Sequence, residues 1–228
     1  MAVDGKGRIY SSDYSPHRIQ VFDVEGKFLN QWAPESGSNL YDLVADRDGN
    51  VYLANDKGVF KHEGETGRLI SKSASLYPRG IAMTWDGKLA VTTRKSILIL
   101  DSSLQTLNEW KDAADAANST FGFEKIVAGG DGIIYALDTN SNDICKFSPE
   151  GKFLNRFPSS ANSPHALAID PKGRLFVSDT SDIEVLDANN GQLLRSIKSN
   201  QAFGLAFNQD GDLFIASRPY VLKHKLNF

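Results

Sequence analysis

The chain has 228 residues, of which 41% are hydrophobic and 23% are charged. This length allows one domain with a sizeable core, and no apolar run approaches the roughly 20 residues that a membrane-spanning helix needs. The formal net charge of −3 argues against a nucleic-acid binder, because such proteins usually carry a basic excess. The opening residues MAVDGKGRIY show no signal peptide, so the compartment stays open.

A glycine followed by a short apolar run recurs six times. Successive glycines are 38 to 45 residues apart, a period typical of repeats built from a few strands. The runs are rich in Val, Ile, Tyr and Phe and are bounded by turn residues, so each predicts a β-strand. They are GRIYSSD from Gly7, GNVYLAN from Gly49, GKLAVTT from Gly87, GIIYALD from Gly132, GRLFVSD from Gly173 and GDLFIAS from Gly211.

Each repeat predicts four strands in one order. The first strand ends at a polar residue or glycine that opens a tight turn into the glycine-led strand. A third strand, a turn and a fourth strand follow, as in HRIQVFDVEGKFL from His17 to Leu29. We expect a single domain, residues 1–228, with repeats at about 1–33, 34–75, 76–110, 120–158, 162–198 and 201–228.

Some segments depart from this pattern or stand out within it. The third strand of the second repeat, GVFKH, is degenerate, and the connection at 108–125 predicts either a short surface helix or a solvated loop. Trp32 and Trp110 end fourth strands, where packing between blades is expected. Cys145 lies in the alternating run DICKFS and predicts an inert, packed thiol.

The ends of the chain fall inside repeats. The first repeat begins within its first strand, and the last, QAFGLAFNQDGDLFIASRPYVLKHKLNF, ends after its third strand. Two interpretations remain: a final blade of three strands, or a piece of a longer chain. We favour the second, with the rest of the parent chain as a partner of this domain.

Strands of this length cannot bury both faces alone, and stacking such sheets around an axis buries them. The predicted fold is therefore all-β: a six-bladed β-propeller of four-stranded antiparallel blades, the first and last incomplete. The segments AVDGKGRIYSSDYSPHRIQVFDVEGKFL and PHALAIDPKGRLFVSDTSDIEVLD resemble NHL repeats. That resemblance implies the same six-bladed propeller and allows either a binding platform or, as in some relatives, a lyase or lactonase.

Two columns of residues are expected on one face of the disc, because first strands start and second strands end there. The residue type in the first column differs in every blade, which is expected where the column surrounds a ligand at the mouth of the channel. Sequence drift at solvent-exposed positions would give the same pattern. We take it as the candidate ligand-binding site: Tyr41, Arg79, Glu124, His165 and Phe203. The second column is short and polar, which predicts loop capping: Asp13, Asn55, Thr93, Asp138, Asp179 and Ser217.

A metal at this mouth is the second possibility. Only His165 of the four histidines is expected near the axis, which argues against a zinc site of converging histidines. Asp138 and Asp179, with Glu124, remain candidate oxygen ligands for calcium. The Glu-Gly-Pro motif that the resemblance associates with lactonases is absent near the start of the chain.

The leading functional hypothesis is a non-catalytic platform that binds a protein, peptide or small ligand through the mouth and needs no cofactor. The alternative is a metal-dependent lactonase or lyase working at the same mouth. In that enzyme His165 would be a base or metal ligand and Arg79 an electrophilic stabiliser. A sensor or scaffold segment of a larger receptor would carry the same sequence pattern.

Overall fold

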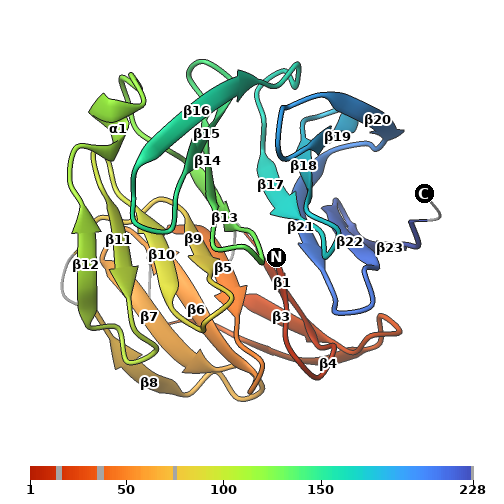
Figure 1. The fold of residues 1–228 in the computed structure, drawn as a ribbon. Helices are drawn as coiled ribbons and strands as arrows, with labels where there is room; N and C mark the ends of the chain where they lie inside the picture. The colour runs from red at the N-terminus through yellow and green to blue at the C-terminus, as the bar shows by residue number, and fades with distance from the viewer. Residues whose placement is uncertain (14–16, 35–38, 74–75, 227–228) are drawn as a thin grey trace.

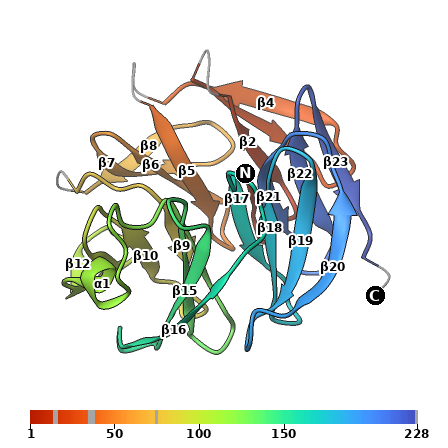
Figure 2. The same ribbon diagram turned by 90° about the horizontal axis from the view of Figure 1, so that it is seen from above.

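Six antiparallel β-sheets surround a central axis in the computed structural model (Figures 1 and 2). The structure describes residues 1–13, 17–34, 39–73 and 76–226. Five sheets have four strands and the last has three, so the predicted six-bladed propeller is confirmed. The N-terminus lies near the axis beside β17 and β21, and the last strand of the chain, β23, is the outermost strand of its blade. No helix in these described ranges has the length and apolarity that a membrane crossing requires.

Each blade is a meander whose strands pair in chain order, with the first strand innermost. The first and second blades are β1 (Ala2–Val3), β2 (Ile9–Ser12), β3 (Ile19–Phe22), β4 (Phe28–Trp32), β5 (Leu40–Ala45), β6 (Asn50–Asn55), β7 (Gly58–Glu63) and β8 (Leu69–Lys72). The third and fourth are β9 (Ile81–Met83), β10 (Leu89–Thr92), β11 (Ile97–Leu100), β12 (Thr106–Trp110), β13 (Lys125–Ala128), β14 (Ile134–Asp138), β15 (Asp143–Phe147) and β16 (Phe153–Pro158). The last two are β17 (Ala166–Ile169), β18 (Arg174–Ser178), β19 (Asp182–Asp187), β20 (Leu193–Lys198), β21 (Ala202–Phe207), β22 (Leu213–Ser217) and β23 (Tyr220–His224).

The terminal blades differ in how complete they are. The first blade has all four strands, although β1 is only two residues long. The sixth blade ends at β23 and has three strands. The segment HRIQVFDVEGKFL forms β3, a turn and the start of β4, and Ile19 pairs with Trp32 across them. The second blade has a regular third strand, β7, where the sequence suggested a degenerate one.

The turn between the first and second strands explains the recurring glycines. Five of the six polar-or-glycine positions accept a backbone N–H from the start of the second strand; Asp46 Oδ1, for example, accepts Asn50 N–H at 2.8 Å. The glycine completing each turn has a φ between 76° and 92°. Because side chains other than glycine are strained there, the turn selects glycine at each repeat.

The core consists of separate apolar clusters between neighbouring blades. Five clusters join blades 1 and 2, 2 and 3, 3 and 4, 4 and 5, and 5 and 6. No such cluster joins blades 6 and 1 among the described residues, and a hollow of about 630 Å³ lies between them. Within the described residues, packed apolar clusters therefore join five of the six pairs of neighbouring blades, whereas blades 6 and 1 meet through their inner strands β1 and β21 beside the hollow.

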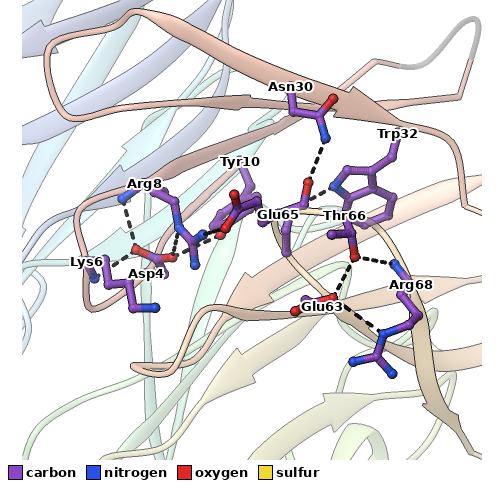
Figure 3. A network of polar contacts seen from close by, with 11 residues as sticks. Asp4, Lys6, Arg8, Tyr10, Asn30, Trp32, Glu63, Glu65, Thr66 and Arg68 are labelled. Carbon is purple, nitrogen blue, oxygen red and sulfur yellow. Dashed lines mark hydrogen bonds and ion pairs between the residues drawn. The ribbon is translucent and has the colours of Figure 1, made fainter.

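Polar contacts reinforce the seam between blades 1 and 2 (Figure 3). Buried Asp4 accepts Arg8 Nε at 2.7 Å and the Tyr10 hydroxyl at 2.9 Å. Arg8 continues to Glu65 of the next blade at 3.1 Å. Burial, together with the charge of Asp4, raises the pKa of Tyr10 well above its ordinary value. The Trp32 indole N–H donates to the carbonyl oxygen of Gly64 at 2.8 Å, so the two blades are joined by hydrogen bonds as well as by apolar contacts.

The long connection after the third blade contains one helical turn, α1 (Ala113–Ala116). Ala113 and Ala114 are buried in the cluster between blades 3 and 4. The segment is therefore helical, as one of the two sequence interpretations expected, but it packs on the core through its alanines rather than lying free on the surface.

Candidate functional site

The six inner strands enclose a cavity of about 310 Å³ on the axis. At one end it reaches Ser12, Tyr41 and Phe203. At the other end a second hollow of about 300 Å³ is bordered by the turns that contain Asp46 and Asp170. Starts of first strands and ends of second strands therefore share one face, as the meander predicts, and we call this end the channel mouth.

The five predicted mouth residues all lie at the starts of inner strands. Tyr41 is in β5 and Phe203 in β21. Glu124 and His165 directly precede their strands, and Arg79 lies two residues before β9. The backbone N–H groups of all three donate to carbonyl oxygens near the ends of the second strands: Arg79 to Thr92, Glu124 to Leu137 and His165 to Ser178. Tyr41 and Phe203 line the cavity, whereas the other three are not among its lining residues.

Tyr41 and Phe203 are each the extra residue of a β-bulge. In the second blade Leu40 pairs with Asn55 and Asp42 pairs with Ala54, which leaves Tyr41 without a partner in the ladder. The register of β21 shifts at Phe203 in the same way. A bulge re-aims the side chain of its extra residue, and these two residues are 44% and 39% exposed.

The remaining mouth residues fall into two contacting pairs. The Arg79 guanidinium forms an ion pair with the Glu124 carboxylate, and each side chain is 40% exposed. The His165 ring lies 5.1 Å from the Phe203 ring, measured between centroids. His165 Nε2 is buried and has no hydrogen-bond partner among the residues that the structure describes.

Two further cations belong to this surface, and the sequence analysis did not select them. Lys125 Nζ donates to the Tyr41 carbonyl oxygen at 2.8 Å and lies 3.6 Å from the Asp42 carboxylate. The Arg218 guanidinium lies over the Phe203 ring at 5.0 Å from its centroid, a cation–π arrangement. The only sequence signal for Lys125 is its position directly after Glu124, at the start of the same inner strand.

The amino group of Met1 also borders the channel. Burial lowers its pKa to about 6, against the opposing attraction of Asp42, and Lys125 adds to the lowering. The axial cavity therefore combines apolar walls from the inner strands with a small group of interacting charges near the mouth.

The second predicted column mainly caps loops. Asp179 Oδ1 accepts the N–H groups of Ser181 and Asp182 at 2.7 and 2.9 Å, and Oδ2 accepts Asn162 N–H at 2.9 Å. Burial opposes ionisation of Asp179, but these backbone hydrogen bonds outweigh it and hold its pKa below the ordinary value. Asn55, Thr93 and Asp138 accept backbone N–H groups in the same manner.

The proposed calcium ligands Asp138 and Asp179 each serve the loop of their own blade. Within the described ranges, no three His, Cys, Asp or Glu side chains gather closely enough to hold a metal ion. The calcium expectation is therefore neither supported nor tested by this arrangement.

Two other candidate reactive residues are built into the core. His62 is buried, its Nδ1 lies 2.9 Å from the Gly67 carbonyl oxygen, and its ring lies 5.1 Å from that of Trp32. Cys145 is fully buried, and burial raises the pKa of its thiol to about 12. Both side chains are therefore packed parts of the core, as the sequence predicted for Cys145.

The comparisons with known proteins are structural. No protein-family model and no curated protein matches the chain. Among solved structures, hydrazine synthase of Kuenenia stuttgartiensis matches with a TM-score of 0.74 at 12% identity, covering 99% of this chain and 94% of that one. A streptogramin B lyase matches with a TM-score of 0.69 at 18% identity, covering 97% of this chain and 76% of that one. Virginiamycin B lyase of Staphylococcus aureus matches with a TM-score of 0.67 at 14% identity, covering 99% of this chain and 83% of that one.

These likenesses show the propeller fold. At such low sequence identities they do not indicate the activity of this chain, because one fold supports many functions. The NHL-repeat resemblance stays an interpretation of the sequence, since no family model supports it.

Proposed function

We propose that this propeller is a binding platform whose channel mouth takes a peptide or small ligand. One observation carries the proposal: the axial cavity and the hollow between blades 6 and 1 meet at the mouth, where both are lined by Ser12, Tyr41 and Phe203. Concave surfaces with exposed aromatic rings and a few polar groups are the usual form of ligand sites. Two bulges present these rings, and neither ring is needed to seal a cluster between blades.

The charges at the mouth suit a ligand of mixed polarity. Arg79 is paired with Glu124, and Lys125 lies near Asp42, so the cations and anions largely compensate one another. Arg218 covers one aromatic ring rather than standing alone. A peptide that places an apolar or aromatic side chain between Tyr41 and Phe203 fits this surface better than a polyanion does.

The test is selection of peptides from a random displayed library on the immobilised propeller. Binders from the wild type are then measured against the Arg79→Ala/His165→Ala double variant and against Phe203→Ala. We expect the affinity to fall about tenfold or more in both variants with the melting temperature nearly unchanged. Trp85→Ala is the matched control, because Trp85 is 69% exposed on a turn at the opposite end of the channel. Selected peptides that bind all four proteins equally would overturn the proposal.

An enzyme at the same mouth is the second candidate. The observation in its favour is His165 Nε2, which is buried beside Phe203 without a partner among the described residues. Two of the structural neighbours are lyases by name. This candidate predicts turnover of a lactone panel, or of virginiamycin B, that is lost in His165→Ala and on chelation of divalent ions. Absence of turnover, with ligand binding intact, would favour the platform.

A further inference from the structure

The hollow at the end of the channel opposite the mouth has an apolar floor. Its volume is about 300 Å³. The floor consists of partly buried residues that each end an inner strand: Val3, Ala45, Ala128, Ile169 and Phe207. The Phe207 ring packs edge-on against Phe176, 4.8 Å between centroids, which holds it in place as one side of the floor. The hollow therefore offers a preformed surface for an apolar group.

The border of the hollow contains carboxylates that are already satisfied. Turns between first and second strands form this border, and three of them begin with Asp4, Asp46 and Asp170. In each, Oδ1 accepts two backbone N–H groups and Oδ2 accepts side-chain donors of the same blade, as Figure 3 shows for Asp4. Arg8 and Arg174 neutralise two of the three charges, so these carboxylates have little left to offer a ligand.

The groups left over at the border are donors. In four of the turns, no group in the described ranges accepts the backbone N–H of the residue after the capping position: Gly5, Arg47, Gly130 and Gln209. The fifth turn has Pro171, which lacks an N–H. The Arg47 guanidinium is exposed and forms no ion pair with any described residue. Because backbone N–H groups and a guanidinium both bind anionic oxygens, the border suits a carboxylate.

The charges just outside the hollow exclude a polyanion as the ligand. The next residue of each turn is a lysine in two blades and an aspartate in four: Lys6, Lys172, Asp48, Asp86, Asp131 and Asp210. None of them lines the hollow. This outer ring does not attract anions from a distance, so an anion must be held by direct contact with Arg47 and the backbone donors, which favours a single small carboxylate.

We propose that this hollow is a second binding site, and that it takes a carboxylate joined to an apolar group. The apolar group lies on the floor beside Phe207, and Arg47 and the neighbouring backbone N–H groups bind the carboxylate. A free aromatic acid and the C-terminal residue of a peptide both have this chemistry. The border shares no residue with the channel mouth, so this site stands or falls independently of the proposed function.

The test titrates the isotope-labelled propeller with hydrocinnamate and follows backbone amide shifts by NMR. Hydrocinnamyl alcohol has the same ring and chain without the charge, and propionate has the charge without the ring. We expect hydrocinnamate to bind with a Kd of about 1 mM or below, and each of the other two to bind at least about tenfold more weakly. The largest shifts are expected at Gly5, Arg47, Gly130 and Gln209.

Three variants locate the binding. Arg47→Gln removes the guanidinium from an exposed turn, and Lys6→Gln is its matched control, because Lys6 is an exposed cation on the neighbouring turn that does not line the hollow. We expect Arg47→Gln to weaken hydrocinnamate binding about tenfold and to leave the alcohol unaffected. Lys6→Gln should change little. Phe203→Ala, at the channel mouth, should leave hydrocinnamate binding unchanged, which separates this site from the proposed function.

Two further ligands distinguish the sources of the carboxylate. A short peptide that ends in Phe with a free carboxylate is compared with the same peptide ending in an amide. Tighter binding of the free peptide than of hydrocinnamate would support the site and assign it to peptide C-termini. Binding of hydrocinnamate without binding of either peptide would support the site and assign it to small aromatic acids.

Three results would overturn the proposal. The first is equal binding of hydrocinnamate and its alcohol, which would mean that the donors of the border do not contribute. The second is an equal loss in Arg47→Gln and Lys6→Gln, which would mean general attraction by charge. The third is the absence of shifts around the hollow at hydrocinnamate concentrations about tenfold above the expected Kd.

Discussion

Trp32 lies across Gly67 of the next blade, so close that a Cβ on that glycine would be 2.5 Å from the indole. The same indole donates its N–H to the Gly64 carbonyl oxygen at 2.8 Å. The contact recurs between Trp110 and Gly151, in later blades of the ring. An aromatic residue at the end of one blade and a glycine in the next therefore form a repeated joint that holds neighbouring blades together.

Substitution of the glycine in this joint should destabilise the fold. Gly67→Ala incurs a strained positive φ and also displaces the Trp32 ring, whereas Gly173→Ala has nearly the same φ, 76° against 75°, and open space around it. We expect Gly67→Ala to lower the free energy of unfolding by about 1–3 kcal/mol more than Gly173→Ala does. Urea denaturation of the two variants measures the difference, and equal losses would show that Trp32 does not depend on this glycine.

The capping carboxylate of Asp179 should make stability depend on pH. Its pKa is below the ordinary value in the folded state, so its contribution is fully present above the unfolded pKa of about 3.9. It is lost as the pH falls through the lower, folded pKa. Asp179→Asn, which removes the charge and the acceptor for Asn162 N–H, should cost about 1–3 kcal/mol at pH 7.

The difference between wild type and Asp179→Asn isolates this group from the other carboxylates. We expect it to be constant from pH 7 to about pH 5 and to shrink below about pH 3.9. Denaturant titrations at a series of pH values give the curve. A difference that grew on acidification would contradict the assigned hydrogen bonds.

Cys145 should be unreactive in the folded protein. The thiol is fully buried and its pKa is raised to about 12, and the thiolate is the reactive form. Labelling with a thiol reagent at pH 8 should therefore be very slow in buffer and rapid in denaturant. Fast labelling of the native protein would mean that β15 opens readily, contrary to its central place in the fourth blade.

The fold could be predicted from the sequence because the residues that define each turn are close together in the chain and recur in every repeat. Each polar residue of the type of Asp46 and each glycine of the type of Gly49 defines one turn through its own backbone contacts. Six repetitions of such a turn leave little choice of topology. The two tryptophans that end fourth strands were predicted to pack between blades, and the contacts of Trp32 and Trp110 confirm this.

The site was only partly within reach of the sequence. Placing Tyr41 and Phe203 on one face followed from strand direction, but the bulges that aim them depend on the register of whole blades. Arg218 reaches Phe203 from the turn between β22 and β23, and no spacing rule connects the two residues. The hollow between blades 6 and 1 could not be predicted from the pattern either, because it depends on how side chains of the two blades lie in space.

The most direct test of the channel mouth is to map where a selected peptide binds. Backbone amide shifts of the isotope-labelled propeller are followed by NMR during titration with that peptide. The platform proposal predicts that the largest shifts cluster at Tyr41, Lys125, His165 and Phe203. Shifts confined to the opposite end of the channel, around Asp46 and Asp170, would contradict it.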